Sequence, residues 1–161
     1  MRRLEEPVRL DPVAADTLIL HGDTLCTDDD AYQRFRARVR DPAWQARMLS
    51  RPAWVRRALA VGARALSRWR TRDKPQQIMD VNPGAVEACF REHQVQRIIH
   101  GHTHRPALHE LTIDGQPCQR VVLGDWHVKG SVVRLVDGGV ELLDLERSER
   151  GELTLRIRAA G

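Results

Sequence analysis

The chain has 161 residues, of which 42% are hydrophobic, so it can form one domain with a substantial core. No apolar stretch is long enough to span a membrane, and the first residues lack the apolar core of a secretory signal. The three widely spaced cysteines exclude a disulfide framework. These features together indicate a reduced cytosolic compartment. The net charge is only +4, but residues 34–74 hold 13 lysines and arginines against two acids, so we expect an anionic partner such as nucleic acid, a membrane surface or a phosphate-bearing substrate.

The first half of the chain predicts one strand followed by helices. Residues 1–13 are typical of irregular or edge structure, 17–22 of a buried strand, and 70–77 of a polar loop. Aspartate caps helices and proline is tolerated in their first turn. We therefore expect helices that begin at Asp28-Asp29-Asp30 and run to about Arg40, at Asp41-Pro42, and at Arg51-Pro52.

Apolar residues recur at helical spacing along the third of these helices: Trp54, Ala58, Val61, Ala65 and Trp69. Together with the surrounding basic residues, this stripe predicts that residues 30–75 form a projecting helical cap. The alternative is that this segment is simply the outer helix layer of the domain.

The second half predicts a helix and then hairpins. Asn82-Pro83 starts a helix that extends through His93, and β patterning follows at 95–100, 107–113, 118–123, 131–136 and 139–144. Asp114-Gly115 and Asp137-Gly138-Gly139 predict hairpin turns. The order indicates an α/β or α+β sandwich over residues 1–145 with the helical cap inserted, followed by a charged, weakly patterned tail at 146–161.

Histidines follow two of the predicted strands. His21-Gly22-Asp23 comes after residues 17–20, and His100-Gly101-His102-Thr103-His104-Arg105-Pro106 comes after residues 95–99. Neutral imidazole binds Mn²⁺, Zn²⁺ or Fe²⁺ well, and glycine permits close backbone approach. We therefore predict His21, His102 and His104 as metal ligands, the alternative being histidines that only form hydrogen bonds within loops.

Four strings together resemble the UDP-2,3-diacylglucosamine pyrophosphohydrolases of lipid A biosynthesis, members of the calcineurin-like metallophosphoesterase superfamily. They are His21-Gly-Asp-Thr-Leu-Cys-Thr-Asp-Asp29, Ile78-Met-Asp-Val-Asn82, His100-Gly-His-Thr-His-Arg-Pro106 and Val122-Leu-Gly-Asp-Trp-His127. The resemblance extends from about residue 5 to about residue 143.

The resemblance implies a metallophosphoesterase fold and hydrolysis of the diphosphate bond of UDP-2,3-diacylglucosamine to lipid X and UMP, with two Mn²⁺ ions as cofactors. It assigns His21 and His102 to one ion and His104 to the other.

The resemblance also implies substrate contacts. His102, Asp29, Ser67 and Lys74 match substrate-binding positions, Thr71 stands where the family carries asparagine, and Arg64 lies one turn before Ser67 and can face the same diphosphate. A helix cap for Asp29, and solvated surface for Ser67 and Lys74, are the structural alternatives.

A diacylated substrate suits the predicted cap: the resemblance implies an apolar interior that holds the acyl chains and a basic exterior that rests on an anionic membrane surface. We therefore expect a peripheral position at the cytoplasmic face of the inner membrane. The tryptophans follow the apolar stripe instead of alternating with the basic residues, so nucleic acid is not an expected partner.

The family's Asp-x-His, Gly-Asp and Gly-Asn-Arg/His-Asp motifs do not occur before His21. The chain is thus expected to be the C-terminal portion of an incomplete metallophosphoesterase domain, with negligible hydrolysis on its own. Asp23, Asp125 and His127 are not expected to replace the absent carboxylates. Two other functions stay open: a non-enzymatic basic module that binds anionic lipid or nucleic acid, and another metal-dependent phosphodiesterase.

Overall fold

The computed structural model describes residues 6–10, 14–71, 80–126, 130–137, 139–148 and 152–161, with the backbone alone at 14–15 and 67–71. The chain folds as two compact units. The first consists of Met1–Leu25 and Val81–Gly161, and the second is Cys26–Asp80. The second unit thus includes the segment 30–75 that the sequence predicts as an insertion.

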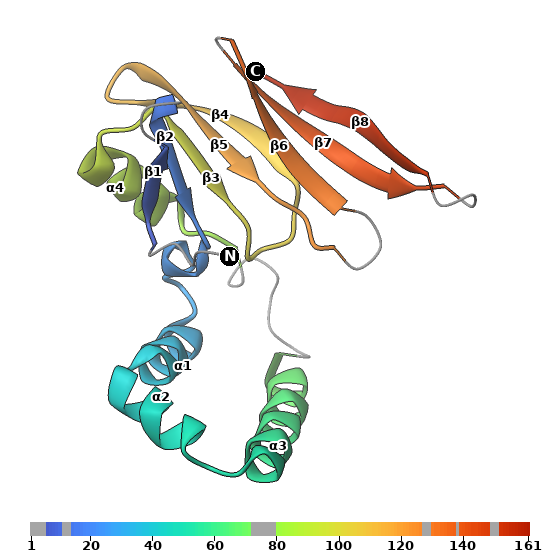
Figure 1. Cartoon of the computed structure of the whole chain (residues 1–161). Coiled ribbons are helices and arrows are strands. Elements are labelled where there is room, and N and C mark those ends of the chain that lie inside the picture. Colours follow the sequence, from blue (N-terminus) through green and yellow to red (C-terminus); the bar gives the residue numbers. More distant parts are fainter. Residues whose placement is uncertain (1–5, 11–13, 72–79, 127–129, 138, 149–151) are drawn as a thin grey trace. The chain divides into compact units, whose positions relative to one another are not determined.

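A five-stranded sheet forms the centre of the first unit (Figure 1). Its strands, in spatial order, are β1 (Val8–Leu10), β2 (Ala14–Leu20), β3 (Arg97–His100), β5 (Gln116–Val122) and β4 (Ala107–Ile113). The three inner strands are parallel, and each edge strand is antiparallel to its neighbour. Leu20 pairs with His100, which in turn pairs with Val122, so the three parallel strands end at the same edge.

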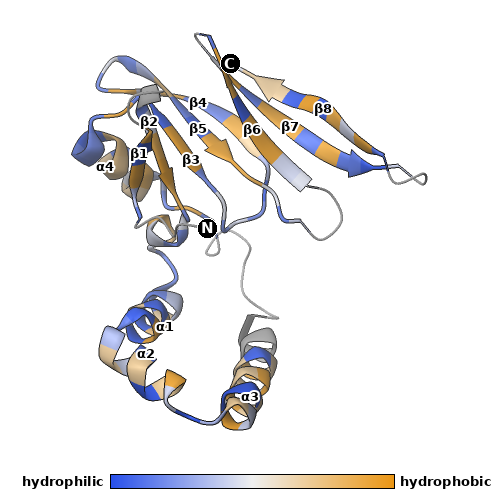
Figure 2. Cartoon of the chain, in the orientation of Figure 1, coloured by the Kyte–Doolittle hydropathy of each residue, from blue (hydrophilic) through white to orange (hydrophobic). Residues whose placement is uncertain are grey.

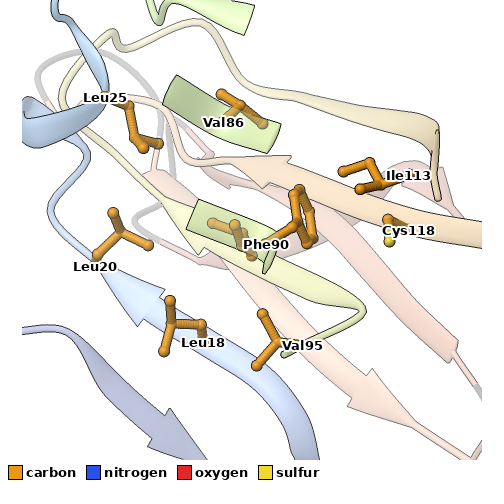
Figure 3. Close-up of a cluster of buried hydrophobic side chains, with 9 residues drawn as sticks. Leu18, Leu20, Leu25, Val86, Phe90, Val95, Ile113 and Cys118 are labelled. Carbon is orange, nitrogen blue, oxygen red and sulfur yellow. The ribbon is translucent and has the colours of Figure 1, made fainter. Parts of the chain in front are cut away.

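Both faces of this sheet are covered. On one face lies α4 (Pro83–His93), whose Val86 and Phe90 pack on Leu18 and the other buried residues of one core cluster (Figure 3). On the other face lies a second sheet of β6 (Gly130–Val136), β7 (Gly139–Arg147) and β8 (Leu153–Ala160). A second core cluster joins the two sheets, and its buried members are Ile99, Val121, Val140 and Leu142. The first unit is therefore a layered α/β structure, as the sequence predicts.

Three helices make up most of the second unit: α1 (Asp30–Arg40), α2 (Pro42–Leu49) and α3 (Ala53–Thr71). Asp29 accepts a hydrogen bond from the backbone N–H of Tyr32 at 3.0 Å, and Asp41 accepts one from Trp44 at 2.6 Å. In the first unit, Asn82 caps α4 in the same way. The predicted helix starts at these three positions are confirmed. Each cap supplies a hydrogen-bond acceptor for an N–H group of the first turn, which has no partner within the helix.

The second unit has little core of its own within the residues that the structure describes. Cys26 is its one buried residue there, and Trp54 is 74% exposed. The part of the apolar stripe that is described, from Trp54 to Ala65, faces solvent and encloses no apolar interior. Within this unit, the predicted interior is therefore not formed by contacts between its own helices.

The last segment differs from the sequence expectation. Residues 146–161, predicted as a weakly patterned tail, contain the end of β7 and strand β8, which is antiparallel to β7. Leucine and isoleucine alternate with polar residues at Leu153, Leu155 and Ile157, which is the period of a strand. The charged residues in this segment obscure the alternation in the sequence.

Candidate metal centre

The two histidine motifs meet at the edge where β2 and β3 end. His21 directly follows β2, and the loop with His102 and His104 directly follows β3. Because the two strands are parallel and in register, their carboxyl ends lie next to each other. The ring centroids of His21 and His102 are 5.0 Å apart, with the ring planes inclined at 56°. The structure thus brings together two of the three predicted ligands.

The two loops are held against each other by backbone contacts. The backbone N–H of Gly101 donates to the carbonyl of His21 at 3.1 Å. Gly22 has a φ of +104°, and a Cβ atom at this position would lie 2.7 Å from Nδ1 of His100. Only glycine fits both the backbone conformation and the space, which explains the glycine in the His-Gly-Asp motif.

The backbone is strained at both histidines of the second motif. The φ angles are +67° at His102 and +54° at His104, values that side chains other than glycine rarely adopt. Such conformations cost about 1–3 kcal/mol each and concentrate at functional sites. The strain therefore supports a functional role for this loop over a plain structural one.

A carboxylate lies beside each of two histidines. Asp23 is 2% exposed, and its Oδ1 is 3.5 Å from Nδ1 of His21. Oδ2 of Asp125, in the loop after β5, is 3.7 Å from Nδ1 of His104. Carboxylates next to one ring nitrogen orient metal-binding histidines and leave the other nitrogen for the ion. In both cases that nitrogen is Nε2.

His21 and His102 suit a first-row divalent cation, because two adjacent neutral imidazoles can share one ion. Among the described residues, no group of three or more histidine, cysteine, aspartate or glutamate side chains is close enough to hold a metal ion. The structure thus brings His21 and His102 together, and the roles of these two residues and of His104 as metal ligands stay predictions.

The predicted substrate residues belong to the second unit. Asp29 caps α1, in line with the structural alternative for this residue, and Arg64 is exposed on α3. The side chains of Ser67 and Thr71, and the whole of Lys74, lie outside the described residues, as does His127. Their roles stay predictions.

Sequence comparison identifies proteins to which this chain is related. A UDP-2,3-diacylglucosamine hydrolase of Klebsiella pneumoniae is 50% identical over 140 residues, which is 87% of this chain and 58% of that protein. Proteins of the same name from Salmonella arizonae and Xanthomonas oryzae pv. oryzae are 49% and 47% identical over 89% and 88% of this chain. This chain is a homologue of the UDP-2,3-diacylglucosamine hydrolases.

This chain spans about 60% of the length of the UDP-2,3-diacylglucosamine hydrolases that it matches. No protein-family model matches the chain. The predicted resemblance is confirmed, and the matched region includes most of both units.

One buried histidine next to the pair is not among the predicted site residues. His100, the last residue of β3, is 1% exposed, and both of its ring nitrogens have polar neighbours. Its presence in the motif was visible, but its contacts with Arg120 and Gly22 depend on segments distant in the sequence. No local pattern could have distinguished it from His102.

Proposed function

We propose that this chain contributes His21, His102 and His104 to a two-manganese centre that hydrolyses the diphosphate bond of UDP-2,3-diacylglucosamine. The proposal places the chain in a metallophosphoesterase domain. The observation that carries it is the side-by-side arrangement of His21 and His102 at the ends of adjacent parallel strands, in a homologue of proteins with that name.

In this proposal, His21 and His102 would hold one ion and His104 the other. When bound, the ions would activate a water molecule and neutralise charge on the diphosphate. Oδ1 of Asp23, 3.5 Å from Nδ1 of His21, would help to orient the His21 ring toward the ion. His102 also touches the substrate in this scheme.

Asp29, Arg64, Ser67, Thr71 and Lys74 of the second unit would contact the substrate. Arg64 is an exposed guanidinium that can bind phosphate oxygens in pairs, and Lys74 would act as a point charge.

We also propose that the second unit rests on an anionic membrane surface, with the protein peripheral to the cytoplasmic face of the inner membrane. Figure 2 shows hydrophobic and hydrophilic residues together on α1, α2 and α3. Basic helices with exposed apolar side chains bind at the interface of an anionic bilayer. No helix among the described residues has the length and hydropathy needed to cross a bilayer.

The metal centre can be tested on two proteins. One is the 161-residue chain, and the other is the same chain joined to the part of the Klebsiella pneumoniae relative that it does not match. We expect Mn²⁺-dependent release of UMP from UDP-2,3-diacylglucosamine by the joined protein and negligible release by the chain alone. In the joined protein, His102→Ala and His104→Ala should each reduce turnover at least about a hundredfold, the scale expected for loss of a metal ligand.

His93→Ala is the matched control, because His93 lies at the end of α4 outside the motifs. Retention of most activity by His102→Ala would refute the ligand assignment. Hydrolysis of UDP-N-acetylglucosamine, which lacks the two fatty acyl chains, at the same rate as UDP-2,3-diacylglucosamine would favour the alternative of another metal-dependent phosphodiesterase. Activity of the chain alone near that of the joined protein would contradict the expected dependence on further ligands.

A further inference from the structure

We propose that His100 is a positioning residue that holds the turn presenting His102, by donating a hydrogen bond from its Nδ1 atom. His100 binds neither metal nor substrate in this view. The inference rests on the proposed function, because it explains how one of the proposed ligands reaches its position.

The turn itself is unusual. The backbone N–H of Thr103 donates to the carbonyl of Gly101 at 2.8 Å, which closes a three-residue turn with His102 at its centre. The φ of His102 is +67°, which makes this the strained form of the γ-turn. A turn of this kind persists only where the surrounding structure stabilises it.

The same carbonyl has a second partner. Nδ1 of His100 lies 2.9 Å from the oxygen of Gly101, and a carbonyl can only accept. Nδ1 of His100 must therefore carry a proton and donate it. The two donors, Thr103 and His100, together use both lone pairs of the carbonyl and fix its direction.

The other ring nitrogen agrees with this assignment. Nη1 of Arg120, on β5, lies 3.2 Å from Nε2 of His100, and a guanidinium can only donate. Nε2 can therefore only accept in this contact, which agrees with Nδ1 as the donor to Gly101. Both ring nitrogens are then engaged, and neither is left to bind a metal ion.

Two further contacts hold His100 in place, one at its ring and one at its backbone. Gly22, in the loop with His21, approaches so closely that a Cβ atom would lie 2.7 Å from Nδ1 of His100. The carbonyl of His100 accepts from the N–H of Leu123 at 2.7 Å, which ties β3 to the end of β5. His100 thus lies between the loops that carry His21 and His102 and contacts both.

Three substitutions separate the donor from the rest of the ring. In His100→Asn the amide nitrogen can replace Nδ1 as donor to Gly101. In His100→Gln the amide reaches the position of Nε2, and His100→Leu removes both groups. We expect amide hydrogen exchange at Thr103 in the metal-free chain to rise about tenfold in the Gln and Leu variants and to stay near wild type in the Asn variant.

Mn²⁺ affinity, measured from the EPR signal of free Mn²⁺, should follow the same order, with His93→Gln as control. Unchanged exchange at Thr103 in His100→Gln, or equal losses in all three variants, would overturn the proposal. If the variants do not fold, the long-range ¹H–¹⁵N spectrum of the wild-type chain decides, since an unprotonated Nδ1 of His100 would exclude the donor role. These readouts need no turnover, so they stand apart from any failure of the proposed hydrolase activity.

Discussion

At the scale of single residues, the candidate site depends on small groups in tight places. Gly22 supplies the space for the buried His100 ring, and the two histidines with positive φ direct their side chains from a short loop. Small changes here act on the site through packing and backbone strain, without altering a ligand.

Gly22→Ala tests this dependence. The new methyl group would meet His100 at 2.7 Å in a backbone with φ of +104°, so both strain and overlap oppose it. We expect the free energy of unfolding to fall by about 2–5 kcal/mol, from about 1–2 for the conformation and the rest for overpacking. Urea denaturation of the wild-type and variant chains measures this difference in the free energy of unfolding.

Gly115→Ala is the matched control, because Gly115 also has a positive φ of +78° but open space around it. It should lose about 1–2 kcal/mol, the cost of strain alone. Equal losses in the two variants would show that His100 does not constrain Gly22.

The cysteines are also defined at this scale. None of the three forms a disulfide, and Cys26 and Cys118 are buried. Burial, followed by the charge of Glu92, raises the pKa of Cys89 to about 11, and burial also raises the pKa of Cys118. Thiols with raised pKa values react slowly, so Cys89 and Cys118 should be poor nucleophiles.

At the scale of elements, the hairpin of β4 and β5 shows how local and tertiary interactions combine. Its two-residue turn has positive φ at Asp114 and Gly115, the conformation that Asp-Gly favours. Arg91 on α4 donates to both carboxylate oxygens of Asp114, at 2.9 and 3.0 Å. The turn is therefore tied to the helix that covers the same sheet.

This ion pair predicts a pH dependence. The hydrogen bonds and charge of Arg91 lower the pKa of Asp114 below its ordinary value of 3.8, so the pair stabilises the folded chain above that pH. The stabilisation is lost as the pH falls through the lowered pKa. Asp114→Asn keeps a residue that tolerates positive φ but removes the charge.

We expect the melting temperature of Asp114→Asn to lie below that of wild type at pH 7 and the gap to close as the pH falls below about 3.8. Thermal unfolding at several pH values measures the gap. Glu110→Gln, on β4 of the same hairpin, is the control, and a gap that stays constant down to the lowest pH would contradict the role of the pair.

At the scale of the whole molecule, two units differ in how they bury apolar residues. The first has two core clusters, whereas the described part of the second buries only Cys26. Exposed apolar residues on basic helices are the basis of the proposed membrane contact.

Vesicle sedimentation tests that contact. The chain should bind vesicles that contain phosphatidylglycerol, bind neutral phosphatidylcholine vesicles weakly, and dissociate from the anionic ones as salt screens the charges. Trp54→Ser should reduce binding severalfold, since it removes a side chain that is 74% exposed. Trp126→Ser is the control, because Trp126 is 67% exposed but belongs to the first unit.

Equal loss of binding in the two tryptophan variants would contradict a contact made by the second unit. Tighter binding to a single-stranded oligonucleotide than to anionic vesicles would favour the nucleic-acid alternative instead.

Most elements could be predicted from sequence because their signals are local. Helix caps at Asp29, Asp41 and Asn82 act within three residues, and the turn at Asp114-Gly115 needs only its own backbone. Strand β8 was missed because its alternation is short and carries several charges, and its pairing with β7 became visible only in the folded chain.

The sequence by itself determined the kind of element at most positions, the histidine motifs and, through them, the resemblance to a hydrolase family. Only the tertiary structure decided that His21 lies beside His102 and that His100 is buried between the loops. The reason is physical: caps and turns act over a few bonds, whereas the direction of each imidazole depends on parallel strand pairing, positive φ angles and neighbours distant in the chain.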